Sequence, residues 1–380
     1  MNNVVQKILF VVNTPDFFMS HRFPLAVAAR DAGYEVHVAT AAGADVSVIQ
    51  SQGFQHHVVS FSRSGQNPFY EFKTFIQLFF LFRVIEPDLV HLVTIKPVLY
   101  GGIVSRLTGV QSVVAAISGL GSAFLATSGV ERLRRWLVGC LYSVAFKQNR
   151  LAVIFQNPDD RDTLLSLGAL QPSQTRLIRG SGVSLDSYLY LPEPDDKPVI
   201  VMAARLLREK GVFEFVEAAR LLQERGVDVE MKLIGSPDPG NPSSVTQMDL
   251  QRWREEGIVQ LPGFRLDIAK QYAKANIVCL PSYYGEGLPK SLVEAAACGR
   301  AVVTTDFPGC RDSITADVTG LLIPPENASA LADALQKLIT EPGLRRQMGK
   351  AGRELAEKDF AIEKIVAQHL EIYKELSGDC

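Results

Sequence analysis

The sequence predicts an α/β protein with two domains, each built around a parallel sheet. Short apolar runs of strand length alternate with longer segments of helical pattern between residues 7 and 178, which is typical of parallel sheets. The same alternation starts again at residue 199. Between the two series, residues 192–198 contain three prolines and two aspartates, a composition typical of a linker. A chain of 380 residues is also long enough for two cores.

The first series opens with a predicted strand at residues 7–13. We expect a loop at residues 15–18 and a helix at residues 20–32, which Gly33 ends because glycine is favoured just past a helix. The further strands are predicted at residues 34–39, 58–61, 88–93, 112–117, 151–156 and 175–178, and the further helices at residues 70–85, 100–107 and 131–148.

The second series predicts a domain of the same kind at residues 191–361, after a first domain at residues 1–190. Residues 362–376 are amphipathic, so we expect residues 362–380 to form a C-terminal helix. The strands of the second domain are predicted at residues 199–203, 230–234, 259–261, 277–280 and 301–305, and its helices at residues 212–225, 248–256, 268–274, 290–297 and 329–340.

The composition excludes several classes of protein. A net charge of −2 argues against a nucleic-acid-binding protein with a broad basic surface. The five cysteines include no close pair, which is typical of a reducing compartment rather than of disulfides or a zinc site. The longest apolar region, residues 75–85, is shorter than the ~20 residues of a membrane-spanning helix, and no secretory signal follows Lys7. We therefore expect a cytoplasmic protein.

The predicted helix at residues 131–148 combines basic residues with apolar ones. Arg132, Arg134 and Arg135 stand beside Trp136 and Leu137. This combination suits an anionic membrane surface, and would make the protein peripheral on the inner face of the cytoplasmic membrane. The alternative is a core-packed helix with a solvated basic end, which the sequence favours slightly.

Residues 280–306 carry the strongest indication of function. Glu286 lies in a glycine-rich turn between a predicted strand and a helix, and Glu294 lies two turns into that helix. In an open parallel sheet, ligands bind at such strand ends, and helix N-termini attract anions. Because carboxylates accept hydrogen bonds from hydroxyls, a diphosphate between two polyhydroxylated rings, as in a nucleotide sugar, fits both features. Taken alone, the spacing fits a solvated loop glutamate and an ordinary helix glutamate better.

The whole stretch EGLPKSLVEAAACGRAVVTTD resembles the signature of the retaining GT-B glycosyltransferases of family 4. This resemblance implies two Rossmann-like domains that face a central cleft, with the C-terminal helix crossing back to the first domain. In that family, the residue matching Glu286 contacts the hydroxyls of the donor sugar, and the residue matching Glu294 contacts the nucleotide ribose.

Arg205 and Lys210 are five residues apart at the end of a predicted strand, where both could reach one diphosphate. Two solvated loop cations are the alternative from the residues alone. The R…EKG pattern resembles the one that holds the donor diphosphate in the same family, which implies catalytic roles for Glu286, Arg205 and Lys210.

The resemblance also implies the rest of the donor site, with a turn at Gly263 and Phe264 that meets the nucleotide base. The sequence shows no paired aspartates suited to a divalent ion. We therefore predict a metal-independent enzyme without a cofactor, with a UDP-sugar as the donor substrate. The expected donor-binding residues are Arg205, Lys210, Gly263, Phe264, Gly287, Leu288, Pro289, Lys290, Ser291 and Glu294.

Three segments of the first domain, FFMSHRFPLA, TIKP and SGLGSAF, resemble a bacterial branch of the family. That branch builds O-antigen, capsule and glycoprotein glycans on a polyprenyl-diphosphate carrier, with UDP-linked N-acetylhexosamines or their deoxy forms as the usual donors. We expect these loops, at residues 14–21, 94–97 and 118–124, to contact the acceptor. The candidates are Phe17, His21, Lys96, Ser118, Gly119 and Gly121, with His91 as a further polar residue.

The expected function is that of a retaining glycosyltransferase that moves such a sugar from a UDP donor to a polyprenyl-diphosphate-linked acceptor. Two alternatives remain: a nucleotide-sugar epimerase on the same scaffold, and a non-catalytic nucleotide-sugar-binding subunit. An epimerase needs more acid and base groups than the sequence offers, and a non-catalytic subunit has no need for Arg205, Lys210, Glu286 and Glu294 together.

Overall fold

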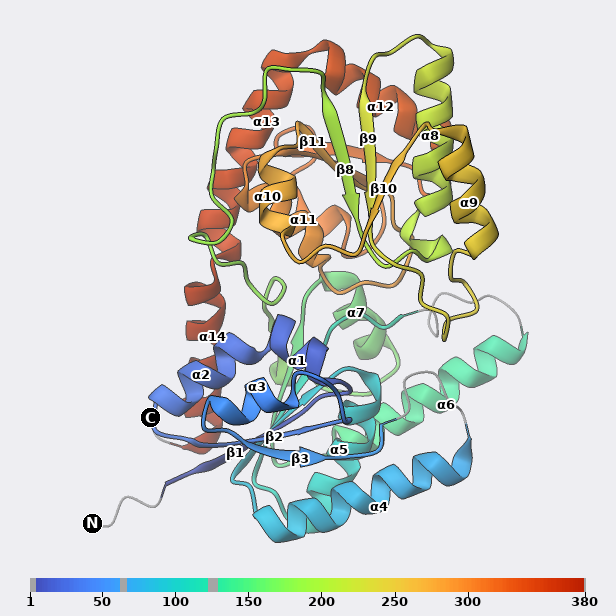
Figure 1. Ribbon diagram of the computed structural model, residues 1–380. Helices are drawn as coiled ribbons and strands as arrows, with labels where there is room; N and C mark the ends of the chain where they lie inside the picture. Colours follow the sequence, from blue (N-terminus) through green and yellow to red (C-terminus); the bar gives the residue numbers. More distant parts are fainter. Residues whose placement is uncertain (1–4, 62–66, 122–128, 379–380) are drawn as a thin grey trace. The chain divides into compact units, whose positions relative to one another are not determined.

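The computed structural model describes residues 5–61, 67–121 and 129–378, with the backbone alone for residues 129–135 (Figure 1). The chain forms two compact units, Met1–Ser181 with Glu363–Cys380, and Gly182–Ile362. Each unit contains one parallel sheet packed between helices. The predicted α/β class with two parallel-sheet domains is therefore confirmed.

The sheet of the first unit has seven strands in the order β3-β2-β1-β4-β5-β6-β7. The chain winds outward from β1 to β3 and then returns to place β4 beside β1. The loops after β1 and β4 therefore diverge at a topological switch point. The strands are β1 (Lys7–Val11), β2 (Glu35–Thr40), β3 (Gln55–Val58), β4 (Leu89–Val93), β5 (Ser112–Ile117), β6 (Arg150–Phe155) and β7 (Thr175–Leu177).

Helices cover both faces of this sheet, and β1 shows why. Leu9 and Val11 pack in one apolar cluster with α4, α5 and α6, while Ile8 and Phe10 pack in another with α1, α2, α3 and α14. This alternation follows the two-residue period of a strand. The helices of the unit are α1 (Pro15–His21), α2 (Phe23–Asp31), α3 (Val46–Ser51), α4 (Pro68–Ile85), α5 (Ile95–Thr108), α6 (Gly129–Ala145), α7 (Pro158–Ser166) and α14 (Ile362–Ser377).

Two segments predicted as loops are helical. Residues 15–18 belong to α1, because Pro15 stands in its first turn, where proline is well tolerated. Arg22, at φ −128°, interrupts the helical backbone, so α1 and α2 replace the single helix predicted at residues 20–32. Residues 95–97 begin α5, so Lys96 lies on a helix.

The sheet of the second unit has six parallel strands in the order β10-β9-β8-β11-β12-β13. The predicted bounds of β8, β9, β11 and β12 are confirmed. The strands are β8 (Val199–Ala203), β9 (Glu230–Ile234), β10 (Gln260–Gly263), β11 (Ile277–Leu280), β12 (Ala301–Thr305) and β13 (Gly320–Ile323). The α-helices are α8 (Val212–Glu224), α9 (Gln247–Glu256), α10 (Ile268–Ala273), α11 (Lys290–Ala297), α12 (Ala328–Thr340) and α13 (Pro342–Leu355).

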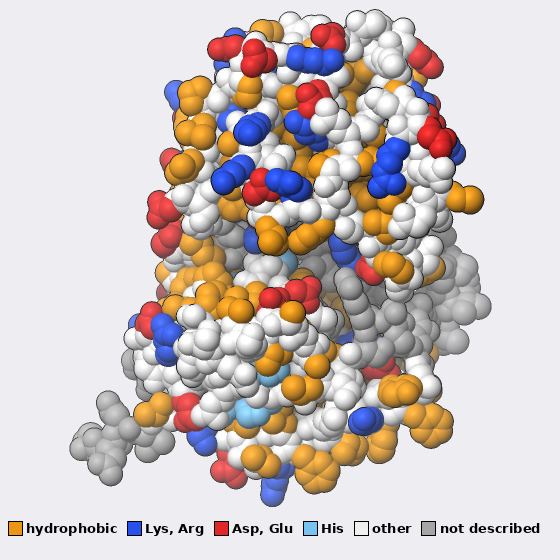
Figure 2. Space-filling model, viewed as in Figure 1, with side chains coloured by type: hydrophobic (Ala, Val, Ile, Leu, Met, Phe, Trp, Pro, Cys, Tyr) orange, Lys and Arg blue, Asp and Glu red, His pale blue; other side chains and the backbone are white. Residues whose placement is uncertain are grey.

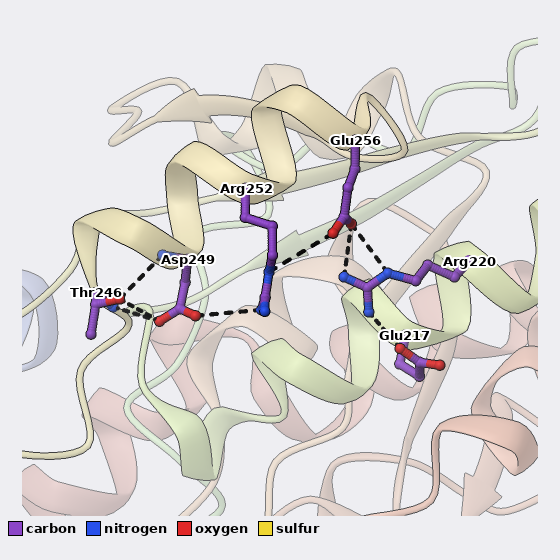
Figure 3. A network of polar contacts seen from close by, with 6 residues as sticks. All are labelled: Glu217, Arg220, Thr246, Asp249, Arg252 and Glu256. Carbon is purple, nitrogen blue, oxygen red and sulfur yellow. Dashed lines mark hydrogen bonds and ion pairs between the residues drawn. The ribbon is translucent and has the colours of Figure 1, made fainter.

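Polar contacts join α8 to α9 on the surface of the second unit (Figure 3). Arg220 Nη2 lies 2.7 Å from Glu256 Oε2, so the ion pair connects the two helices. Thr246 and Asp249 form a capping box at the start of α9: Asp249 N donates to Thr246 Oγ1, and Thr246 N donates to Asp249 Oδ2, both at 3.1 Å. The capping box satisfies backbone N–H groups that the first turn of a helix leaves without partners.

The boundary between the units falls after Ser181, earlier than the predicted boundary after residue 190. Val183 N donates to Phe360 O at 2.9 Å, which ties the start of this segment to the second unit. The proline-rich segment predicted as a linker is held in the same unit. Glu193 Oε2 lies 2.8 Å from Arg345 Nη2, and both side chains are almost fully buried. A buried ion pair of this kind is costly to break, so Glu193 anchors this segment to the second unit.

From Glu363 onward, α14 belongs to the first unit. Tyr373 is fully buried, and its hydroxyl forms a hydrogen bond with His91 Nδ1 of β4. The rings of His91 and His369 stack, with centroids 5.7 Å apart. Burial, helped by the charge of Arg22, holds the pKa of His91 well below its usual value and lowers the pKa of His369 to about 3. Both imidazoles are therefore neutral in the folded protein.

Within the described ranges, no helix is long and apolar enough to cross a membrane. The basic residues that suggested a membrane contact for α6, Arg132, Arg134 and Arg135, have side chains outside the described part of the structure.

Candidate active site

The candidate donor site lies at the carboxyl ends of β8 and β11. These strands are neighbours in the sheet, although β9 and β10 separate them in the sequence. The chain reverses its winding direction between them, and ligands of open α/β sheets bind at such a point. The segment after β8 carries Arg205 and Lys210, and the loop after β11 carries Glu286.

Main-chain contacts hold these two segments together. Tyr283 N donates to Glu209 O at 2.9 Å, and Ser282 Oγ lies 3.1 Å from the same carbonyl oxygen. Gly211 has a φ of 79°, and a Cβ at this position would lie only 2.2 Å from Pro281 O. Only glycine permits this approach, so the sequence Glu-Lys-Gly serves the packing of the backbone as well as the charge of the site.

Lys210 and Glu286 form an ion pair between the two segments. Lys210 Nζ lies 2.6 Å from Glu286 Oε1, and their side chains are 11% and 13% exposed. Ser282 Oγ lies 2.9 Å from the same carboxylate oxygen, and the ring of Tyr284 has its centroid 5.3 Å from Lys210 Nζ. An ammonium group has three donors, so Lys210 can hold Glu286 and a ligand oxygen at the same time.

Arg205 has a different partner in the second unit. Its Nη1 lies 3.3 Å from Asp238 Oδ2, in the loop after β9, and its side chain is 45% exposed. A single long contact at this exposure is weak. Because the guanidinium has five donors in a planar fork, Arg205 can bind an anion while it keeps this contact.

Glu294 is buried in α11 and has two partners. Lys290 Nζ, one turn earlier, lies 3.4 Å from Glu294 Oε1. The hydroxyl of Tyr188 donates a hydrogen bond to the same carboxylate. Burial raises the pKa of Glu294, while Lys290 and the hydrogen bond from Tyr188 act in the opposite direction. Tyr188 was not predicted, since it stands far from Glu294 in the sequence and belongs to no motif.

The loop after β11 is supported by a close backbone contact. A Cβ on Gly309 would lie 2.5 Å from Glu286 O and 2.6 Å from Gly287 O, and Gly309 has a φ of 82°. The loop that presents Glu286 therefore rests directly on the segment after β12. The other predicted residues here are Gly287, Leu288, Pro289 as the N-cap of α11, and Lys290 and Ser291 in its first turn.

The turn predicted to meet the nucleotide base follows β10, the edge strand that pairs with β9. Gly263 ends β10 with a φ of 74°, and Phe264 after it is 70% exposed. Since all strands of this sheet are parallel, this turn lies at the same edge as Lys210 and Glu286.

In the first unit, three strand ends carry buried oxygen atoms that lack partners. Among the residues that the structure describes, Asn13 Oδ1 after β1, Thr94 Oγ1 after β4 and Ser118 Oγ after β5 make no hydrogen bond. Thr94 also has a φ of 73°, a strained conformation for a β-branched residue. Buried polar atoms without partners are few in native proteins and indicate a site for water or a ligand. Sequence reasoning did not single out Asn13.

The other candidates of the first unit contact one another or α4. His21 stacks on Phe17, with ring centroids 4.0 Å apart. Lys96 Nζ lies 2.6 Å from Glu71 Oε1 of α4, so this contact directs its side chain to that helix. Gly119 and Gly121 follow Ser118, with φ values of 103° and 64°. His91, by contrast, is fully buried beside α14 and has a structural role.

Two adjacent aspartates of the first unit lie at the start of a helix. Asp159 and Asp160 form the first turn of α7, where Asn157 Oδ1 accepts a hydrogen bond from Asp160 N at 2.8 Å. In the described part of the chain, no three His, Cys, Asp or Glu side chains gather in a group suited to a metal ion. Metal independence stays a prediction.

Two family models match the chain. The model described as glycosyl transferases group 1 matches residues 190–355, and the one described as glycosyl transferase 4-like matches residues 7–157. Together they account for most of the chain and for both units.

Curated relatives match over nearly the full length. The chain is 29% identical over 379 residues to the N,N'-diacetylbacillosaminyl-diphospho-undecaprenol alpha-1,3-N-acetylgalactosaminyltransferase of Campylobacter jejuni, with 94% of this chain and 97% of that protein covered. It is 23% identical to the capsular polysaccharide biosynthesis glycosyltransferase CapM of Staphylococcus aureus, with 90% of each protein covered.

Solved structures share the fold. Sucrose-phosphate synthase of Thermosynechococcus elongatus superposes with a TM-score of 0.81 at 22% identity, covering 99% of this chain and 100% of that one. HepE of Anabaena, in complex with UDP-glucose, superposes with a TM-score of 0.76 at 19% identity, covering 98% and 99%. Identities this low establish the fold alone.

Proposed function

Because this chain belongs to the glycosyl transferases group 1 family, we propose that it moves a sugar from a UDP-linked donor to a lipid-linked acceptor in bacterial polysaccharide synthesis. The sugar would be an N-acetylhexosamine or a deoxy derivative, and the acceptor a polyprenyl-diphosphate-linked saccharide. The relative from Campylobacter jejuni, which transfers N-acetylgalactosamine to such an acceptor, supports this choice.

The observation that carries the proposal is the ion pair of Lys210 with Glu286. It joins a cation, suited to a phosphate oxygen, to a carboxylate, suited to sugar hydroxyls, at the switch point of the second unit. A nucleotide sugar presents both kinds of group within a few bonds of each other. Arg205 would bind the same diphosphate, and Glu294 would accept hydrogen bonds from the ribose.

We propose a retaining reaction by front-face attack. The bond between the anomeric carbon and the phosphate oxygen breaks, and the acceptor hydroxyl forms a new bond to that carbon on the same face. The proton of the hydroxyl passes to the departing phosphate oxygen. Lys210 and Arg205 would stabilise the negative charge that develops on UDP, and Glu286 would orient the sugar without attacking it.

The acceptor would bind the first unit at its own switch point. The oxygens of Asn13, Thr94 and Ser118 that lack partners would there bond to polar groups of the acceptor. With three cations available in the donor site, Arg205, Lys210 and Lys290, charge stabilisation does not require a metal ion, and we propose that none takes part.

Product analysis tests the proposal. The purified protein is incubated with a panel of UDP-sugars, with and without a polyprenyl-diphosphate-linked saccharide and with and without EDTA. Sugar transfer only when the acceptor is present, undiminished by EDTA and with the anomeric configuration kept, would support it. Interconversion of UDP-sugars without acceptor would indicate an epimerase, and binding without any product would indicate a non-catalytic subunit.

A further inference from the structure

The helix α4 presents an apolar face to solvent. Its opposite face is in the core of the first unit, where Leu78, Phe82 and Ile85 are almost fully buried. The exposed side chains are large: Phe69 is 86% exposed and Val84 is 81% exposed. The exposed face, which we call the α4 patch, comprises Phe69, Tyr70, Phe72, Lys73, Phe80, Arg83 and Val84.

The patch is not a by-product of a generally apolar surface. A globular protein usually exposes large apolar side chains singly, and a contiguous group indicates a binding surface. Here Phe69, Phe72 and Phe80 recur at helical spacing along one side of an 18-residue helix. Figure 2 shows hydrophobic side chains with Lys or Arg among them at the lower right of the view, where α4 lies in Figure 1.

The charged residues of the helix divide by sign. Lys73 and Arg83 lie among the exposed aromatic side chains. The acid within α4, Glu71, lies on another side, where it pairs with Lys96 at 2.6 Å and accepts a hydrogen bond from Tyr100 at 2.7 Å. The α4 patch therefore combines apolar surface with positive charge, as an anionic lipid surface requires.

We propose that the α4 patch docks this protein onto an anionic lipid bilayer, with α4 lying in the interface. The aromatic side chains would enter the headgroup region, and Lys73 and Arg83 would contact lipid phosphates. The helix lies along the surface, since it is not long and apolar enough to span a bilayer. The inference builds on the proposed function, because a lipid-linked acceptor would be met at this surface.

A lipid surface suits the patch better than a second copy of the chain. In a two-fold symmetric contact the same surface meets itself, so the basic residues Lys73 and Arg83 of both copies would be brought into one contact. Like charges brought together in an apolar contact oppose association.

The neighbouring helix α6 is a second point of contact. It packs on α5, as α4 does, and Trp136, Leu137, Leu141 and Val144 are exposed on it. Trp136 is 59% exposed, whereas the other tryptophan of the chain, Trp253, is 1% exposed in the core of the second unit. Trp136 thus offers an intrinsic probe of the membrane, and Trp253 an internal reference.

Co-sedimentation with vesicles tests the inference. The full chain should bind vesicles of phosphatidylglycerol and phosphatidylethanolamine, and bind phosphatidylcholine vesicles at least about tenfold more weakly. The triple variant F69S/F72S/F80S and the double variant K73E/R83E should each lose about tenfold or more of this binding. The matched control M248S/V318S replaces side chains that are 80% and 52% exposed in the second unit, and should bind as the unchanged chain does.

Further readouts keep the result unambiguous. Each variant should show the same midpoint shift with UDP as the unchanged chain, which shows that it is folded. Brominated lipids should quench Trp136, and the quenching should vanish in W136F. Vesicle binding that survives in both α4 variants would overturn the inference. So would a chain that does not bind vesicles but forms a dimer, if F69S/F72S/F80S converts that dimer to monomers. If vesicles bind but no sugar is transferred, the docking stands and the proposed function fails.

Discussion

Glu286 is held by two neighbours of different kinds, the ammonium of Lys210 and the hydroxyl of Ser282. We predict that Glu286→Gln lowers the rate of sugar transfer by about a hundredfold or more, because a neutral amide accepts hydrogen bonds from the sugar hydroxyls more weakly than a carboxylate does. UDP binding, measured by calorimetry, should change little. Glu217→Gln, on the surface of α8, is the control. An equal loss of UDP binding would mean that Glu286 contacts the nucleotide rather than the sugar.

The hydroxyl of Tyr188 offers a test of what controls the pKa of Glu294. The hydrogen bond that it donates lowers the pKa of Glu294, against the effect of burial. We predict that Tyr188→Phe raises this pKa, so that the acidic limb of the pH–activity profile moves to higher pH and the KM for the UDP-sugar rises about tenfold there. At high pH the two proteins should behave alike. A uniform loss at every pH would instead indicate a packing role.

The two glutamates were predictable from the sequence, and their partners were only partly so. Short motifs can be recognised directly in a sequence, and such motifs contain Glu286, Glu294, Lys210 and Arg205. The pairing of Lys210 with Glu286 depends on the way two strand ends meet. Tyr188 lies far from Glu294 in the sequence, and only folding brings the two side chains into contact. No residue pattern records contacts of this kind.

The capping box at the start of α9 allows the contribution of one hydroxyl, that of Thr246, to the stability of the protein to be measured. We predict that Thr246→Ala lowers the free energy of unfolding by about 1 kcal/mol, because Asp249 N loses its acceptor. Arg252→Ala, which removes exposed ion pairs of the same helix, should cost less than about 0.5 kcal/mol. Urea unfolding followed by circular dichroism measures both. An effect of Arg252→Ala as large as that of Thr246→Ala would contradict this ranking.

Strands and helices with strong patterns were predicted closely, and short or glycine-containing ones were missed. The strands at residues 112–117, 199–203 and 301–305 consist mostly of apolar residues, as is typical of buried parallel strands. The helix α13 was missed, since its glycines argue against a helix. The structure supplies their reason: a Cβ on Gly349 would lie 2.2 Å from Gly299 O, so this glycine lets two backbones meet.

Stability of the first unit should depend on pH through its buried histidines. The pKa of His369 is about 3 in the folded protein and returns to about 6.5 on unfolding, so the unfolded chain binds more protons between these values. Stability is therefore full above about pH 6.5 and falls as the pH is lowered through this window. His369 alone should remove about 2 kcal/mol between pH 7 and pH 5.

Urea unfolding at pH 7 and pH 5 checks this prediction. The difference between the two pH values should be smaller in His369→Gln, which cannot bind the proton, whatever the absolute stability of the variant. His91 stacks on His369 and, because its pKa is also lowered, should add to the pH dependence. The pKa values of His37, His56 and His57 are lowered by burial as well, so these residues should contribute in the same direction. An unchanged difference would show that His369 is not the source.

The position of α14 at the end of the chain affects the order in which the two units can fold during synthesis. The core of the first unit contains Ile365, Ile372 and Tyr373, which the ribosome adds after all of the second unit. The first half of the chain therefore emerges early, but the part of its core that α14 supplies is absent until the last residues are made. The second unit is contiguous, and it can complete its core first. We therefore expect the second unit to complete its core before the first unit does.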